Sequence, residues 1–221
     1  MGKLMVIDGL DGCGKSTQLR LLDEYLRERG NAYRQISFPD YEQPSSALVK
    51  MYLGGELGSS PDAVNAYAAS SFYAVDRYAS FVRFWREDYQ NGVPIVAARY
   101  TTSNAFHQMT KLPRNEWDGF LDWLEHYEYD LLGLPRPDSV IFLDMPIEIS
   151  QKMLSGRYGN DEQKKDIHER DLRYLSACRE AALYAAEKRG WYRIACHDGD
   201  KPLPAETIRE KILDVYTKTM E

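Results

Sequence analysis

The chain has 221 residues, of which 43% are hydrophobic, so it is long enough to bury one core and is expected to form a single domain over residues 1–221. Its net charge of -6 argues against a general nucleic-acid-binding protein, and no segment approaches membrane-spanning length. The three cysteines have no C-x-x-C spacing and the four histidines no metal-ligand spacing, which argues against a disulfide framework or a zinc site and favours a cytoplasmic protein that binds small molecules.

Five short apolar segments are predicted to be strands, and helical patterns fill the gaps between them. The strands are expected near residues 4–8, 33–38, 94–98, 139–143 and 191–195. This alternation predicts an α/β fold with a parallel sheet and crossover helices. Ligands are then expected outside the carboxyl ends of the strands, beside the loops at Gly9, Pro39, Arg99 and Asp144.

The first loop has the sequence GLDGCGKST and matches G-x-x-x-x-G-K-[ST] at every constrained position. A predicted strand precedes it and a helical pattern follows, so its amide groups would converge on phosphate oxygens at a helix N-terminus. Lys15 would reach the β and γ phosphates of ATP, and Ser16 would be the protein's ligand to Mg²⁺. The predicted ATP-binding residues are Gly9, Gly12, Cys13, Gly14, Lys15, Ser16 and Thr17.

Two residues inside this loop have more than one interpretation. Asp11 places a negative charge where phosphate is expected, so it either accepts a hydrogen bond from a sugar hydroxyl of a second substrate or is a solvated loop acid. Cys13 lies near a helix N-terminus, where its pKa would be lowered, but a small residue that fills space also fits.

A long helix is predicted to begin at Ser60-Pro61-Asp62 and to run to about Gln90. On it, Tyr73 and Arg77 are four residues apart and share a face. An aromatic ring there can stack on a base while a guanidinium group grips a phosphate, although the same spacing also suits a core residue and a surface residue.

The polar segment 156–166, with the sequence GRYGNDEQKKD, resembles a lid that closes over phosphates and supplies a cation. An ordinary solvated connection between helices is the alternative.

Taken together, the motifs resemble those of the thymidylate kinase family, which are P-loop nucleoside monophosphate kinases, over nearly the whole chain. They are GLDGCGKSTQ, SFPDY, SFYAVDRY, ARYTTSNAFHQ and GLPRPDSVIFLDMP. The resemblance implies a three-layer P-loop NTPase fold with strand order 2-3-1-4-5 and a short lid, and it implies a homodimer. It also implies transfer of the γ-phosphoryl group of ATP to dTMP, with Mg²⁺ as cofactor.

The same resemblance implies roles for individual residues. Asp11 would contact the 3′-hydroxyl of dTMP, Tyr73 would stack on thymine, and Arg77 and Arg99 would hold the acceptor phosphate. The other implied dTMP-binding residues are Phe38, Pro39, Ser103, Asn104 and His107. Since Gly12 follows Asp11 where some relatives have arginine, the lid would supply the catalytic cation, from Arg157, which would act with Lys15 and Arg99.

The sequence departs from the family pattern where Asp-Arg-Tyr is usual, because Ala98 precedes Arg99 and Tyr100. The acid expected near Mg²⁺ is therefore missing, and turnover is expected to be impaired. A second departure is that no arginine follows Pro39 closely. The alternatives are a kinase for another deoxynucleoside monophosphate or for a nucleoside, and a nucleotide-binding protein with little turnover.

Overall fold

The computed structural model describes residues 1–158 and 172–221, without the side chains of residues 155–158. A five-stranded sheet of order β2-β3-β1-β4-β5 crosses the molecule, and every neighbouring pair in it is parallel. Its strands are β1 (Leu4–Asp8), β2 (Arg34–Ser37), β3 (Ile95–Ala98), β4 (Ser139–Asp144) and β5 (Tyr192–Ala195). The predicted α/β class, all five strand positions and the strand order are confirmed.

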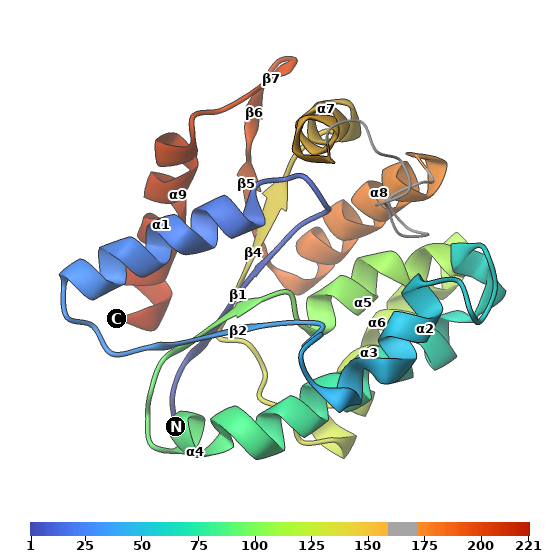
Figure 1. Ribbon diagram of the computed structural model, residues 1–221, viewed down its shortest axis with the longest axis horizontal. Helices are drawn as coiled ribbons and strands as arrows, with labels where there is room; N and C mark the ends of the chain where they lie inside the picture. Colours follow the sequence, from blue (N-terminus) through green and yellow to red (C-terminus); the bar gives the residue numbers. More distant parts are fainter. Residues whose placement is uncertain (159–171) are drawn as a thin grey trace.

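Helices cover both faces of this sheet (Figure 1). They are α1 (Lys15–Glu28), α2 (Ala47–Leu53), α3 (Ala66–Ser80), α4 (Arg86–Gln90), α5 (Thr101–His107), α6 (Trp117–Glu125), α7 (Ile147–Tyr158), α8 (Leu172–Arg189) and α9 (Ala205–Met220). A two-stranded antiparallel hairpin, β6 (His197–Asp198) with β7 (Lys201–Pro202), was not anticipated from the sequence.

The core is divided by the alternation of side chains along β1. Met5 and Ile7 pack with α1 and α9 on one face, whereas Leu4 and Val6 pack on the other face with a cluster that contains Trp85. All five side chains of β1 are fully buried. Because both faces of the strand are covered, the four residues from Leu4 to Ile7 are all apolar. Such a continuous apolar run is typical of a central parallel strand.

The predicted start of the long helix at Ser60 is wrong. Pro61–Ala63 forms a separate 3₁₀ turn, and α3 begins at Ala66 after Asn65, whose side-chain oxygen accepts from the backbone N–H of Ala68 at 2.9 Å. This asparagine is the N-cap that defines the helix start. From Ala66 the chain stays helical to Gln90, through a π-helical segment at Phe81–Trp85.

Candidate active site

The phosphate loop joins β1 to α1 and is held close to its neighbours. A Cβ atom at Gly12 would lie 2.6 Å from the carbonyl oxygen of Ser150, and one at Gly9 would lie 2.8 Å from that of Leu143. The φ angles are +78° at Gly12 and +92° at Gly14. These contacts and angles exclude side chains, so the loop backbone is free to approach a ligand closely.

Lys15 lies at the mouth of this loop. Its Nζ donates to the carbonyl oxygens of Gly9 at 2.6 Å and Leu10 at 2.9 Å, and it is 3.9 Å from Oδ1 of Asp11. The ammonium group is thus held over the loop, next to the acid that the sequence singled out.

Arg99 joins Asp11 to the end of β1. Its Nη2 donates to Oδ1 of Asp11, and its Nη1 is 3.9 Å from Oδ1 of Asp8. Burial disfavours the charge of Arg99, but Asp11 and Asp8 outweigh this effect and raise the pKa of its guanidinium group, which stays charged. The backbone of Arg99 has φ +61°, a left-handed conformation that is uncommon for a non-glycine residue and occurs at functional sites.

Asp8 was not identified from the sequence as a site residue, yet it organises this region. It is fully buried, and its carboxylate accepts from the amide of Gly9 at 2.8 Å and from the hydroxyls of Thr102 at 2.6 Å and Ser103 at 2.7 Å. A charged residue at the end of a buried apolar strand, directly before the phosphate loop, was the signal that could have found it.

A cavity of about 490 Å³ lies at this edge of the sheet. Asp11, Lys15, Ser16, Ala98 and Arg99 all line it, so the loop, the start of α1 and the end of β3 face one space. Ala98, which is 7% exposed, lines this cavity together with Ser16, at the position where the family pattern has an aspartate.

Asp144, the last residue of β4, forms ion pairs with two arginines. Its carboxylate accepts from Nε of Arg179 at 2.7 Å and from Nε and Nη2 of Arg193 at 2.9 and 2.6 Å. Two guanidinium groups therefore compensate its charge.

Arg77 forms a buried ion pair with Glu128. The Nε and Nη2 atoms of Arg77 donate to the two carboxylate oxygens of Glu128, each at 2.6 Å, and both side chains are at most 2% exposed. Glu128 also accepts from Thr101 Oγ1 at 2.8 Å and from Asn104 Nδ2 at 3.2 Å. Sequence reasoning did not identify Glu128, because an acid in a helical segment carries no motif.

The other predicted dTMP-binding residues lie on three elements. Tyr73 lies on α3, and its ring is perpendicular to that of Tyr52, at a centroid distance of 6.5 Å. Phe38 is buried after β2 beside Pro39. The ring of His107, at the end of α5, lies 6.1 Å from that of Tyr174 on α8. Their contacts with a base stay predictions.

Burial raises the pKa of the Cys13 thiol, although Lys15 and Arg99 oppose the shift. The lowered pKa that a helix N-terminus would give Cys13 is therefore contradicted, and the other interpretation, a small residue that fills space in the core, fits.

Most of the predicted lid lies outside the described residues. Residues 156–158 end α7, and the side chain of Arg157 is not among those described.

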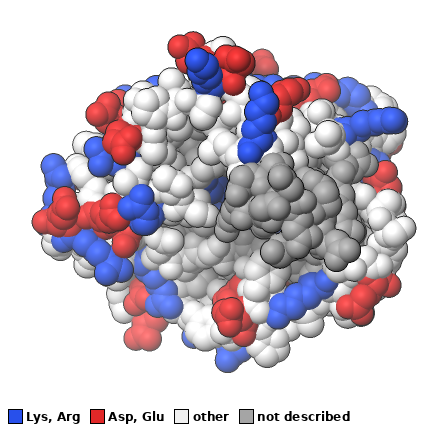
Figure 2. All heavy atoms as spheres, turned by 45° about the horizontal axis from the view of Figure 1, so that its top comes forward, with Lys and Arg blue, Asp and Glu red and all other residues white. Residues whose placement is uncertain are grey.

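The described part of the face at the carboxyl ends of the strands carries Lys and Arg interspersed with Asp and Glu (Figure 2).

Among the described residues, no helix has the length and apolar character needed to cross a membrane.

Comparison with known proteins identifies the family. The family model for thymidylate kinase matches residues 7–202. Thymidylate kinase from Mycobacterium tuberculosis H37Rv is 30% identical over 191 residues, which cover 85% of this chain and 87% of that protein. Human thymidylate kinase is 29% identical over 174 residues, 78% of this chain and 74% of that protein. The solved structure of thymidylate kinase from Candida albicans matches with a TM-score of 0.69 and 18% identity, covers 100% of this chain and 94% of that one, and so supports the fold. The chain belongs to the thymidylate kinase family.

Proposed function

We propose that the protein transfers the γ-phosphoryl group of ATP to dTMP and so forms ADP and dTDP. The observation that carries this proposal is the cavity in which Lys15, Ser16, Asp11 and Arg99 meet. Its cations come from a phosphate loop and from the end of a neighbouring strand. That arrangement suits two phosphate groups brought together for in-line transfer.

The protein's part in the reaction is to position the substrates and to stabilise negative charge. The acceptor phosphate is already an oxyanion, so no general base is needed. Lys15 would bind the donor phosphates and Arg99 the acceptor phosphate. Asp11, held by Arg99, would accept a hydrogen bond from the 3′-hydroxyl of dTMP.

Ser16 would hold Mg²⁺, which supplies charge stabilisation at the donor phosphates. The described residues contain no group of three His, Cys, Asp or Glu side chains that could hold a metal. A site with a single serine hydroxyl, phosphate oxygens and water nevertheless suits Mg²⁺, which keeps several waters when it binds with nucleotides.

A role for Arg77 at the acceptor phosphate is limited by its pair with Glu128. Two of its three guanidinium nitrogens are engaged there, which leaves Nη1 outside the pair. We propose that the pair fixes the orientation of Arg77, so that Nη1 is the atom that would reach the acceptor. Arg157 from the lid stays the proposed additional cation.

A homodimer is also proposed, supported by an apolar stripe on α3 and the π-helical segment after it. Tyr67, Val75, Tyr78 and Val82 share one helical face and are each 39–42% exposed. Such a stripe on a helix suits contact with a second copy of the chain. Cytoplasmic location stays a proposal that rests on the cysteine pattern.

The position of Ala98 favours one alternative, a nucleotide-binding protein with little turnover. The test is a coupled assay of ADP release with ATP, Mg²⁺ and a panel of nucleoside monophosphates and thymidine. We expect ADP release to be fastest with dTMP and to disappear in Lys15→Ala, which should stay folded by circular dichroism. Release with thymidine but not dTMP would favour a nucleoside kinase, and nucleotide binding without release would favour the low-turnover alternative.

A further inference from the structure

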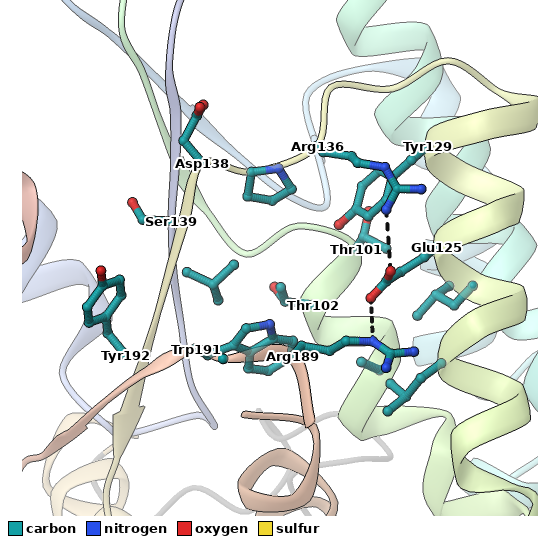
Figure 3. Close-up of a pocket in the computed structure, with 16 residues that line it drawn as sticks. Thr101, Thr102, Glu125, Tyr129, Arg136, Asp138, Ser139, Arg189, Trp191 and Tyr192 are labelled. Carbon is teal, nitrogen blue, oxygen red and sulfur yellow. Dashed lines mark hydrogen bonds and ion pairs between the residues drawn. The ribbon is translucent and has the colours of Figure 1, made fainter. Parts of the chain in front are cut away.

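A second cavity, of about 350 Å³, lies beside α5 and α6 at the amino ends of β4 and β5 (Figure 3). Ser139, the first residue of β4, and Tyr192, the first residue of β5, line it. The phosphate loop lies at the opposite, carboxyl end of the sheet. None of the residues assigned above to ATP or dTMP lines this space, which we call the Arg136–Arg189 cavity.

One wall consists of two arginines that share one carboxylate. Nη1 of Arg136 lies 3.3 Å from Oε2 of Glu125, and Nε of Arg189 donates to Oε1 at 2.6 Å (Figure 3). Outside the lining, Asp130 accepts from Nη2 of Arg136 at 2.8 Å and Asp122 from Nη2 of Arg189 at 2.5 Å. These pairs fix both guanidinium groups and leave Arg136 Nε and Arg189 Nη1 outside them.

The side-chain nitrogens that these pairs leave over are hydrogen-bond donors. The carboxylate of Asp138 points away from the cavity and accepts from the amide of Leu4 at 2.7 Å (Figure 3). Ser139 Oγ accepts from Thr219 at 3.0 Å. The indole nitrogen of Trp191, a donor, faces the cavity (Figure 3). Guanidinium and indole groups donate and do not accept, so the lining is suited to a ligand rich in acceptors, such as an anion.

The rest of the lining is apolar and aromatic. Leu121, Leu124 and Val140 contribute aliphatic surface, and the ring of Tyr129 lies under the guanidinium group of Arg136, 4.7 Å from it. The volume falls within the range of about 300–1,000 Å³ that is common for small-molecule sites. A flat ring system can therefore lie on this surface while its anionic group meets the arginines.

Two threonines connect this cavity to the phosphate-loop side of the sheet. Thr101 and Thr102 line the cavity at the start of α5. Thr101 Oγ1 donates to Glu128, the partner of Arg77, and Thr102 Oγ1 donates to Asp8, which also binds the amide of Gly9. A ligand that shifts the first turn of α5 would move hydrogen-bond donors to both carboxylates.

We propose that the Arg136–Arg189 cavity is a second ligand site, that it takes a small planar organic anion, and that its occupancy alters dTMP binding through Thr101 and Thr102. The binding site stands independently of the proposed function, whereas the coupling rests on it.

The test uses 8-anilinonaphthalene-1-sulfonate, a fluorescent monoanion with a planar naphthalene ring, as the probe, titrated into the full chain. Arg136→Leu and Arg189→Leu should each weaken binding by about tenfold. Glu125→Gln should tighten it by about tenfold, because it removes the carboxylate that competes for both guanidinium groups. Arg114→Leu is the matched control, since Arg114 also lies over aromatic rings, those of Trp117 and Tyr184, but outside this cavity.

N-phenyl-1-naphthylamine has the same rings without the sulfonate, and its binding should not respond to the arginine substitutions. If both probes respond alike, or if the Glu125 and arginine variants do not shift the sulfonate's affinity in opposite directions, the ligand site is overturned. Circular dichroism on each variant confirms that it is folded.

The coupling is measured by calorimetric titration of dTMP with and without saturating probe. We expect a change in dTMP affinity of at least about threefold, which Thr101→Val reduces, since that change keeps the side-chain shape but removes the hydroxyl. An unchanged dTMP affinity overturns the coupling. A protein that binds the probe as described but binds no dTMP contradicts the proposed function and leaves the ligand site standing.

Discussion

The buried partner of a side chain limits what that side chain can do, and Arg77 is an example. Its spacing from Tyr73 fits a ligand-binding face, but two of its guanidinium nitrogens bind Glu128 in the interior. A buried ion pair contributes little net stability over an apolar pair, yet removal of one partner leaves an uncompensated charge. The pair is therefore best tested through both residues together.

Arg77→Met should lower the free energy of unfolding by about 3–5 kcal/mol, because Glu128 is left charged and buried. Adding Glu128→Leu should recover most of that loss. Urea unfolding of both single variants and the double variant measures the coupling. The exposed pair Arg20–Glu24 is the control, and Arg20→Met should cost less than about 1 kcal/mol. An equal cost at Arg77 and Arg20 would contradict this account.

Ala98 gives a prediction on turnover. Ala98→Asp should raise kcat on the order of 10²-fold, because it adds a carboxylate beside Ser16 in the cavity. The dissociation constants for ATP and dTMP should change by less than about tenfold, since Lys15 and the loop amides do not depend on position 98. Single-turnover phosphoryl transfer at saturating Mg²⁺ is the measurement. Ala98→Asn has similar size without the charge, and equal rates for the two variants would refute the role of the carboxylate.

Contacts between elements depend on a few polar side chains, and Lys111 is the clearest case. Its Nζ donates to the hydroxyl of Tyr52 on α2 at 3.0 Å and to the carbonyl oxygen of Val64 at 2.8 Å. It thereby connects α2 and the segment before α3 to the turn after α5. Burial lowers the pKa of Lys111 from 10.5 to about 8.

This pKa predicts how stability depends on pH. Below pH 8 both the folded and unfolded chains hold the proton, and the folded state bears the cost of a buried charge. Between pH 8 and 10.5 the unfolded chain keeps the proton while the folded chain releases it, so the free energy of unfolding rises with pH. Relative to Lys111→Met, the wild type should gain about 1–2 kcal/mol over this interval, after allowance for solvent screening.

Urea unfolding of the wild type and of Lys111→Met from pH 7 to 10.5 measures this difference in the free energy of unfolding. The other titrating groups contribute equally in both proteins, so their effects cancel. A constant difference between the two proteins would mean that the Lys111 pKa is not lowered.

At the scale of the whole molecule, the face drawn in Figure 2 mixes charges of both signs, and α3 with the π-helical segment after it carries the apolar stripe. In the proposed homodimer, this stripe would be covered by the second copy of the chain.

Val75→Arg should therefore convert a dimer into a monomer in size-exclusion chromatography with light scattering, because it places a charge within the stripe. Leu131→Arg is the matched control, since Leu131 is 66% exposed but lies outside the stripe, and it should leave the dimer intact. A wild-type chain that is monomeric at high concentration would rule out the homodimer.

The sequence by itself determined the strands and the phosphate loop, since both follow from local patterns. A buried parallel strand must be continuously apolar, and the loop needs glycine where a Cβ atom would collide with Ser150 or Leu143. The start of α3 was missed because two capping signals lay five residues apart, at Ser60 and Asn65, and only Asn65 accepts the hydrogen bond that begins the helix.

The tertiary structure alone decided the partners of the charged residues. Asp8 meets Thr102, and Arg77 meets Glu128, across 94 and 51 residues of chain. No local pattern encodes such pairs, because they depend on which strands are neighbours and how the helices pack on them. The Arg136–Arg189 cavity has the same origin, since its walls come together only when α5, α6 and the starts of β4 and β5 are assembled.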